Sequence, residues 1–270
     1  MTFEQHAQSF GAAADAYERG RPGYPDEVAD WLVPDGAGAD GAGRGAGAEG
    51  AGADGARVVV DVGAGTGKFT RTLLGRAGRS VTGVPFEVVA VEPDAAMRAR
   101  LTAALPGVRA LDGTGESIPL EDGSADAVTF AQAWHWVDPA RGAAEVARVL
   151  RPGGVLGLVW NVRDETRPWS ARLGALMKQP ESRVMDYGAP VVGAPFDGGE
   201  YRRFPWVHEQ ERSAFLDMVA SRSYVIVRPP EERAALLDAV QRLLDEDPDT
   251  AGRATVPVAY TTHVHRYLRP

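Results

Sequence analysis

Three glycines at alternate positions follow a run of valines and an acid at residues 58–69, VVVDVGAGTGKF. The valines are β-branched and continuous, which favours a strand buried on both faces of a parallel sheet. Glycines adopt backbone angles closed to other residues and carry no Cβ to hold a ligand away from the main chain. Helical spacing follows at 68–74, so free N–H groups at a helix start should face the turn. The segment predicts a turn on which a ligand lies against bare backbone.

The acid before the first glycine, Asp61, has two possible roles: it braces the turn, or it meets a positively charged group of the ligand. The turn itself also has a simpler interpretation, as a tight connection from strand to helix. A nicotinamide or flavin fold requires G-x-G-x-x-G. Here the third glycine, Gly67, comes one position early, and Lys68 stands where that glycine should be.

The spacing D-x-G-x-G-x-G resembles motif I of the class I S-adenosylmethionine-dependent methyltransferases, of the small-molecule, ubiquinone-biosynthesis-like type. The similarity extends over about residues 10–268. It implies a Rossmann-like α/β fold, with a seven-stranded, mostly parallel sheet, an antiparallel last strand and helices on both faces. It also implies S-adenosyl-L-methionine as cofactor. The turn residues expected to bind it are Asp61, Gly63, Ala64, Gly65 and Gly67.

Glu92 ends a second apolar run at 88–91. In an open α/β sheet, ligands bind at the carboxyl ends of the strands. One carboxylate can accept hydrogen bonds from both hydroxyls of a ribose, and the resemblance assigns that role to Glu92. It also places Pro93 and Met97 on the adenine face. The alternative is a solvated acid at a strand end.

The segment 113–120, GTGESIPL, looks like the family's stretch after the third strand, with Gly115 and Glu116 at the nucleobase end of the pocket. This chain departs from the pattern, because Thr114 replaces the acid that usually receives the adenine amino group. Either the Thr114 hydroxyl and nearby backbone take that role, or Asp112 does.

The segment 126–137, DAVTFAQAWHWV, predicts a buried fourth strand with a polar and aromatic tip. The resemblance places Gln132 and Ala133 over the methionine portion of the cofactor. Three ring side chains would lie where the methyl group points: Trp134, His135 and Trp136. Rings near a sulfonium add cation–π attraction of about 0.5 to 2 kcal/mol. The alternative is that the tryptophans only pack the core or a lid.

Further elements follow from the remaining patterns. In 148–161, RVLRPGGVLGLVWN, we expect a helix that ends at Pro152, a turn at Gly153 and Gly154, and a fifth strand. Later we expect a strand at 207–212, a helix at 213–221 capped by Ser213, a helix at 231–244 and a last strand at 256–268. His263 and His265 share one face of that strand, but no third ligand motif lies nearby, so no metal site is expected.

Composition divides the chain into five parts. Residues 1–33 are expected to form a helical lid with Phe10, Tyr17 and Arg21 as candidate substrate contacts, or else to pack on the sheet edge. Residues 34–56 are a Gly/Ala-rich run with almost no large apolar group, which predicts a flexible linker. The resemblance implies that residues 57–161 form the cofactor-binding core, that 162–202 are an insertion that covers the acceptor, and that 203–270 are the rest of the same sheet domain.

Charge and cysteine content exclude several classes of function. The net charge of −8 offers no basic surface for nucleic acid or for an anionic membrane. The absence of cysteine excludes disulfides, thiolate metal sites and the enzymes that methylate a pyrimidine carbon through a cysteine adduct. The N/D-P-P-Y/F motif of amino-methylating DNA enzymes is missing, as is the paired-glutamate loop of protein arginine enzymes. With neither a signal segment nor an apolar span, we expect a cytoplasmic protein.

Methyl transfer from a sulfonium depends mainly on placing the acceptor in line with the methyl carbon. If the acceptor is a hydroxyl, a general base helps, and His135 is the first candidate and His208 the second. A neutral amine or an activated carbon needs none. Two other functions compete: a nicotinamide-dependent oxidoreductase, and a relative that binds the nucleoside without turnover. The motifs name neither the acceptor nor the oligomeric state.

Overall fold

A computed structural model describes residues 20–35, 57–80, 86–177 and 190–270. They form two compact units. Unit 1 comprises the described residues of 1–22, 162–186 and 205–261, and unit 2 comprises those of 23–161, 187–204 and 262–270. Residues of the predicted cover segment at 162–202 and of the predicted sheet segment at 203–270 occur in both units, and the role of 162–202 as a cover for the acceptor stays a prediction. Phe10, Tyr17 and nearly all of the Gly/Ala-rich run lie outside the described residues.

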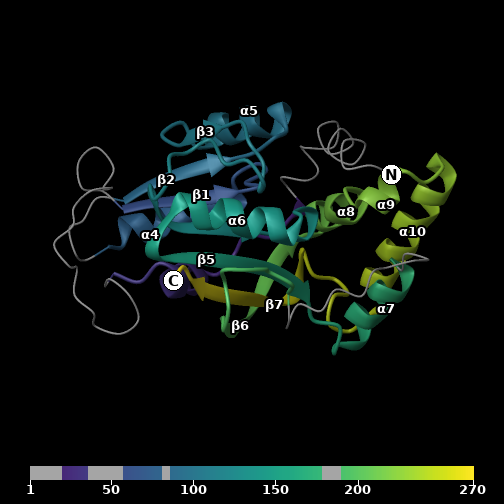
Figure 1. Cartoon of the computed structure of the whole chain (residues 1–270). Helices are drawn as coiled ribbons and strands as arrows, with labels where there is room; N and C mark the ends of the chain where they lie inside the picture. The colour runs from purple at the N-terminus through teal and green to yellow at the C-terminus, as the bar shows by residue number, and fades with distance from the viewer. Residues whose placement is uncertain (1–19, 36–56, 81–85, 178–189) are drawn as a thin grey trace. The chain divides into compact units, whose positions relative to one another are not determined.

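The described strands form one seven-stranded sheet in the order β3-β2-β1-β4-β5-β7-β6 (Figure 1). Its strands are β1 (Arg57–Val62), β2 (Phe86–Val91), β3 (Arg109–Leu111), β4 (Ala125–Ala131), β5 (Leu150–Arg163), β6 (Glu200–Glu211) and β7 (Thr255–Leu268). β7 runs antiparallel to both of its neighbours, and the other pairs are parallel. The predicted sheet with an antiparallel last strand is therefore confirmed.

The register of the central strands brings the predicted site residues to one edge. β1 pairs in parallel with β2, with Asp61 opposite Ala90 and Val62 opposite Val91. β1 also pairs with β4, with Asp61 opposite Thr129. Because parallel strands share a direction, the glycine turn after β1, the acid after β2 and the tip after β4 all leave the same edge of the sheet.

Helices in unit 2 cover both faces of this sheet. They are α3 (Asp26–Leu32), α4 (Lys68–Gly78), α5 (Ala95–Ala104) and α6 (Pro139–Val149). Side chains of α3 and α4 pack with Val59 of β1 and Ala127 of β4. Successive strand residues face opposite sides, so Phe130 lies on the other face, where its ring meets Trp134 at 4.9 Å. A Cβ at Gly142 of α6 would lie 3.2 Å from that tryptophan ring, which places α6 there.

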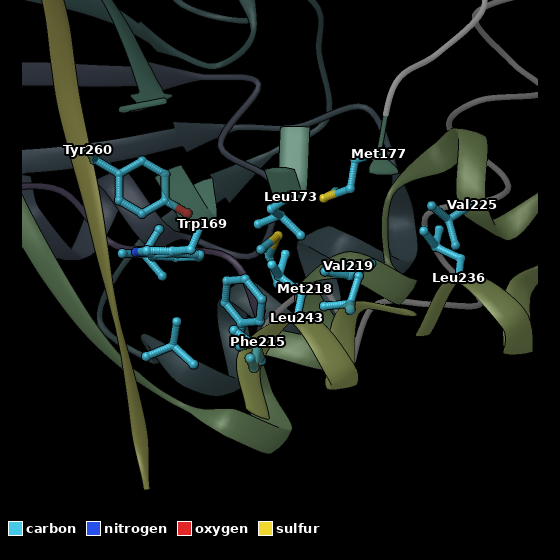
Figure 2. Packing of buried hydrophobic residues seen from close by; sticks show 14 residues of the cluster. Trp169, Leu173, Met177, Phe215, Met218, Val219, Val225, Leu236, Leu243 and Tyr260 are labelled. Carbon is cyan, nitrogen blue, oxygen red and sulfur yellow. The ribbon is translucent and has the colours of Figure 1, made fainter. Parts of the chain in front are cut away.

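Unit 1 has an apolar cluster of its own, shown in Figure 2. It is built from α7 (Pro168–Leu176), α8 (Arg212–Ala220), the short α9 (Ser223–Ile226), α10 (Pro230–Glu246) and the first half of β7. Trp169 and Leu173 come from one face of α7, because residues four apart lie on the same side of a helix. Phe215 of α8 packs against Trp169 with ring centroids 6.2 Å apart.

The predicted end of the helix before β5 is wrong. α6 ends at Val149 rather than at Pro152, and residues 150–154 belong to β5. Gly153 does adopt a positive φ of 75°, as a turn glycine would. However, its N–H donates to Arg269 O (2.9 Å), and Arg269 N–H donates to Gly154 O (2.8 Å). Because this segment pairs with Arg269, it forms an irregular stretch of strand instead of the expected turn.

The predicted cap at Ser213 is also wrong. α8 begins at Arg212 with Glu211 as its N-cap, and no side chain caps it. Arg212 N–H donates to Ala254 O (3.1 Å), so strand-like bonding continues up to the helix and Ser213 already lies inside it. β6 likewise begins at Glu200, earlier than predicted. Pro205 lies within this strand, and proline is tolerated there because β6 is at the edge of the sheet.

None of the described helices combines the length and the apolar character needed to cross a bilayer.

Candidate functional site

The glycine turn joins β1 to α4 and is tied to the end of β2. Val91 O accepts hydrogen bonds from Gly63 N–H (2.8 Å) and Ala64 N–H (3.2 Å). A Cβ at Gly63 would lie 2.6 Å from the Cβ of Ala133, and one at Gly67 would lie 2.9 Å from Leu105 Cδ1. Two of the three glycines are therefore required by close packing within the protein itself.

Gly65 is different, because the space beside it is open. Its φ is +58°, yet a Cβ there would meet only Met97 Sδ, at 3.9 Å. Its N–H donates to Glu92 Oε2 over 2.8 Å. The bond joins the middle of the glycine turn to the acid after the neighbouring strand. Packing does not demand a residue without a side chain here, so the open backbone is available to a ligand.

Glu92 is held in place by two backbone donors. Besides Gly65, Asp94 N–H donates to its Oε1 over 2.9 Å. Only 7% of Glu92 is exposed, and this burial raises the pKa of the carboxyl above its ordinary value, opposed by the two backbone hydrogen bonds. Asp94 in turn caps α5, since its Oδ1 accepts from Met97 N–H at 2.8 Å. The predicted ribose acid is thus buried and fixed beside the glycine turn.

Asp61 is fully buried and braces the turn, the first of the two roles considered for it. Thr70 Oγ1 of α4 donates to its Oδ2 (2.7 Å), and Thr129 Oγ1 of β4 lies 3.4 Å from its Oδ1. Desolvation raises the pKa of Asp61 from 3.8 to about 7. Sequence analysis missed both threonines. The β1–β4 register could have identified Thr129, which lies directly opposite Asp61.

At the expected nucleobase end, side chains bond to other parts of the protein. Glu116 Oε1 accepts from Asp138 N–H at the start of α6 (2.9 Å). Thr114 and Ser117 exchange backbone hydrogen bonds (3.0 and 3.2 Å) that close the loop around Gly115. Asp112 is largely exposed and pairs with Arg98 at 3.3 Å.

Arg98 is a further residue that the sequence did not single out. Its Nη1 donates to Glu92 O (2.7 Å) and Pro93 O (3.0 Å). This one side chain therefore joins Asp112 to the backbone around Glu92. The sequence signal that could have identified Arg98 was its spacing, because it follows Asp94 by four residues, one helical turn along α5.

The chain turns after β4, and hydrogen bonds fix the conformation of this turn. β4 ends at Ala131, and Gln132 has φ +57°, the one positive φ outside glycine among the described residues. Gln132 N–H donates to Val159 O (2.8 Å), and its Nε2 donates to Asn161 O (2.9 Å). Asn161, missed by sequence analysis, also donates to Gly23 O (2.8 Å) and accepts from Thr262 Oγ1 (2.7 Å).

The three rings that follow differ in exposure. Trp134, His135 and Trp136 form a short 3₁₀ turn. Trp134 is buried, and its Nε1 donates to Val191 O at 2.9 Å, so it packs the core as in the alternative interpretation. His135 is exposed, as is Trp136 at 46%, and their ring centroids lie 4.8 Å apart. Only these two rings present surface for contact with an acceptor.

Four other candidates lie elsewhere. Arg21 is half-buried and belongs to unit 1, as does His208, whose ring lies 5.8 Å from that of Trp206. His263 and His265 do share a face, since the ring of Tyr201 contacts both, at 5.9 and 4.6 Å. In the described part of the chain, no three His, Asp or Glu residues are grouped so as to hold a metal ion.

Comparison with known proteins assigns the family. Residues 60–158 match the model of a methyltransferase domain. An uncharacterized methyltransferase of Mycobacterium tuberculosis strain H37Rv is 44% identical over 94% of this chain and 93% of its own length. An uncharacterized methyltransferase-like protein of Schizosaccharomyces pombe is 30% identical over 91% and 90%.

A solved structure agrees on the fold. The protein from Anaeromyxobacter dehalogenans, described as a type II methyltransferase, aligns with a TM-score of 0.65 and 22% identity, over 92% of this chain and 97% of its own. The glycine turn and the acid after β2 lie inside the segment that matches the family model. This chain belongs to the class I S-adenosylmethionine-dependent methyltransferases.

Proposed function

We propose that unit 2 binds S-adenosyl-L-methionine on the glycine turn and Glu92, and that the enzyme transfers the methyl group to O, N or C of a small-molecule acceptor. The observation that carries this is the bond from Gly65 N–H to Glu92 Oε2 at 2.8 Å, beside open space. The cofactor supplies a methyl group on a sulfonium, which needs no further activation. The net charge of −8 favours a small acceptor over a nucleic acid.

Glu92 suits the ribose because its carboxylate can still accept further hydrogen bonds. Each carboxylate oxygen offers about two lone-pair sites, and the backbone occupies one site on each oxygen. Hydroxyl groups of a sugar can use the others. Because both backbone donors hold the carboxylate in one orientation, little side-chain entropy remains to be lost on binding.

The start of α4 supports a ligand at the same turn. Gly67 is its N-cap in the left-handed conformation, and no side chain caps the helix. The first N–H groups of a helix lack partners inside the helix and carry partial positive charge. They favour a carboxylate, which the methionine portion of the cofactor provides.

His135 and Trp136 are the groups we assign to the acceptor side. Both are exposed at the tip after β4, on the edge of the sheet that carries the glycine turn. His135 removes the proton if the acceptor is a hydroxyl, and it lines the pocket if the acceptor is a neutral amine. The ring of Trp136 offers a face to the positive charge of a sulfonium.

Replacement of Gly65 by valine tests the binding site. A side chain at this open position would fill the space for the ligand, so we expect at least tenfold weaker binding of S-adenosylhomocysteine in a calorimetric titration. Gly123→Val is the matched control, because Gly123 also has a positive φ, +62°, and nothing within 4 Å of its Cβ position.

Both variants should lose similar stability from backbone strain, about 1 to 2 kcal/mol. The control should keep wild-type affinity. Unchanged affinity in Gly65→Val, or an equal loss in both variants, would contradict the proposed pocket.

A further inference from the structure

The apolar cluster of unit 1 contains a tyrosine hydroxyl with no hydrogen-bond partner in the described part of the chain. Tyr260 lies on β7, is 3% exposed and stacks on Trp206 with ring centroids 5.5 Å apart. Figure 2 shows the hydroxyl end of its ring pointing toward Trp169. The indole N–H of Trp169 is likewise buried without a partner among these residues.

Such donors are unusual inside a protein. A buried polar group without a hydrogen bond costs about 1 to 3 kcal/mol, so proteins rarely retain one without a use for it. Phenylalanine at position 260 would fill the same space without that cost. Buried donors that lack an acceptor point to a ligand that brings one.

Two arginines reach into the same cluster. Arg163 Nη1 lies 3.7 Å from Met177 Sδ, and Arg222 Nη2 lies 3.5 Å from Met218 Sδ. Both methionines belong to the cluster that contains Tyr260. A thioether is only a weak acceptor for a charged donor. The Nε–H of Arg163 is buried and has no partner in the described residues, although its Nη2 pairs with the half-exposed Glu165 at 2.6 Å.

A third arginine, Arg21, is anchored beside this cluster. Gln210 Nε2 donates to Gly20 O over 2.8 Å, and a Cβ at Gly20 would lie 2.4 Å from Met218 Cα. The residue before Arg21 is therefore packed directly on α8. Burial raises the pKa of the Tyr260 hydroxyl, and the positive charges of Arg222, Arg163 and Arg21 oppose that rise. Asp164 N–H donates to Ala259 O (2.9 Å), so the neighbouring residues Arg163 and Tyr260 lie on adjacent strands.

We propose that Tyr260, Arg163, Arg222 and Arg21 form a site in unit 1 for an oxyanion, the carboxylate or phosphate group of a small organic molecule. The hydroxyl donates one hydrogen bond, and the guanidinium groups supply charge and further donors. Planar guanidinium groups match carboxylate and phosphate oxygens well.

The anion site does not rest on the proposed function, because all four of its residues belong to unit 1, whereas the glycine turn and Glu92 belong to unit 2.

The test uses the full chain and two probes, citrate for a carboxylate and inorganic phosphate for a phosphate ester. Tryptophan fluorescence and melting temperature are followed during each titration, with sodium chloride at equal ionic strength as reference. We expect a saturable response to at least one probe. A response to citrate alone identifies a carboxylate ligand, and a response to phosphate alone identifies a phosphate ester.

Tyr260→Phe removes only the hydroxyl and should weaken binding of the responding probe at least tenfold while the protein stays folded. Tyr267→Phe is the control, since Tyr267 is also largely buried on β7 and only desolvation raises the pKa of its hydroxyl. Arg163→Met should also weaken binding of the probe. The proposal would be overturned if Tyr260→Phe bound the probe as tightly as the wild type does. It would also be overturned if citrate and phosphate changed the fluorescence and melting temperature of the wild type no more than sodium chloride does.

Titration with S-adenosylhomocysteine separates this inference from the proposed function. Tyr260→Phe should keep wild-type affinity for that ligand. If the wild-type protein binds the anion but not S-adenosylhomocysteine, the proposed function fails and the anion site stands. The reverse result rejects the anion site alone.

Discussion

At the edge of the sheet, some residues stabilise the glycine turn and others remain able to bind a ligand. Gly63, Gly67 and Asp61 are accounted for by contacts within the protein, whereas Gly65 and Glu92 combine fixed positions with capacity left for a ligand. The sequence motif identified all five but could not separate the two roles. That separation depends on which Cβ positions are blocked and which hydrogen bonds are already made, and both require packing partners distant in sequence.

The brace at Asp61 should make stability depend on pH. Its folded pKa of about 7 exceeds its ordinary value of 3.8, so the folded state retains a proton that the unfolded chain has released. Stability from this group is complete below pH 4 and is lost as pH rises toward 7. At about 1.4 kcal/mol per pKa unit, the loss is on the order of 4 kcal/mol.

Urea denaturation of the wild type and of Asp61→Asn from pH 5 to pH 8 measures this effect. Because asparagine does not titrate, the free energy of unfolding of the wild type should fall relative to that of the variant as pH rises. Parallel pH profiles for the two proteins would show that Asp61 does not retain its proton.

At the scale of elements, sequence patterns located the strands but missed several ends. β1, β2, β7 and the helix after β1 lie close to their predicted positions, because buried apolar runs and helical spacing are local signals. The predicted end of α6 and the predicted start of α8 were wrong. In both, backbone bonds to distant residues, Arg269 and Ala254, decide where strand gives way to helix. No local pattern carries that information.

Asp94 links two elements, since it follows β2 and caps α5. Loss of an N-cap oxygen costs about 1 kcal/mol. Asp94→Ala should therefore lower the free energy of unfolding by about that amount, measured by urea denaturation. Asp94→Asn retains an oxygen that can accept from Met97 N–H and should stay within a few tenths of a kcal/mol of the wild type. Equal destabilisation by both substitutions would rule out the cap as the cause.

At the scale of the whole molecule, the division into two units was the least accessible feature from sequence. Domain boundaries usually fall in linkers rich in glycine, proline or polar residues. Here one boundary does fall at such a position, between Pro22 and Gly23, but three others fall within β5, β6 and β7, strands of 14, 12 and 14 residues that run from one unit into the other. The two sites that we propose lie in different units. The family motifs lie in unit 2, and the arginines around Tyr260 lie in unit 1, where no motif drew attention to them.

The central claim is that the glycine turn and Glu92 together bind S-adenosylmethionine. A crystal structure of the full chain with S-adenosylhomocysteine tests it most directly. We predict ribose hydroxyls within hydrogen-bond distance of the Glu92 carboxylate and the nucleoside lying against the backbone of Gly65. Density for the ligand at any other place, or a ribose with no contact to Glu92, would contradict the account.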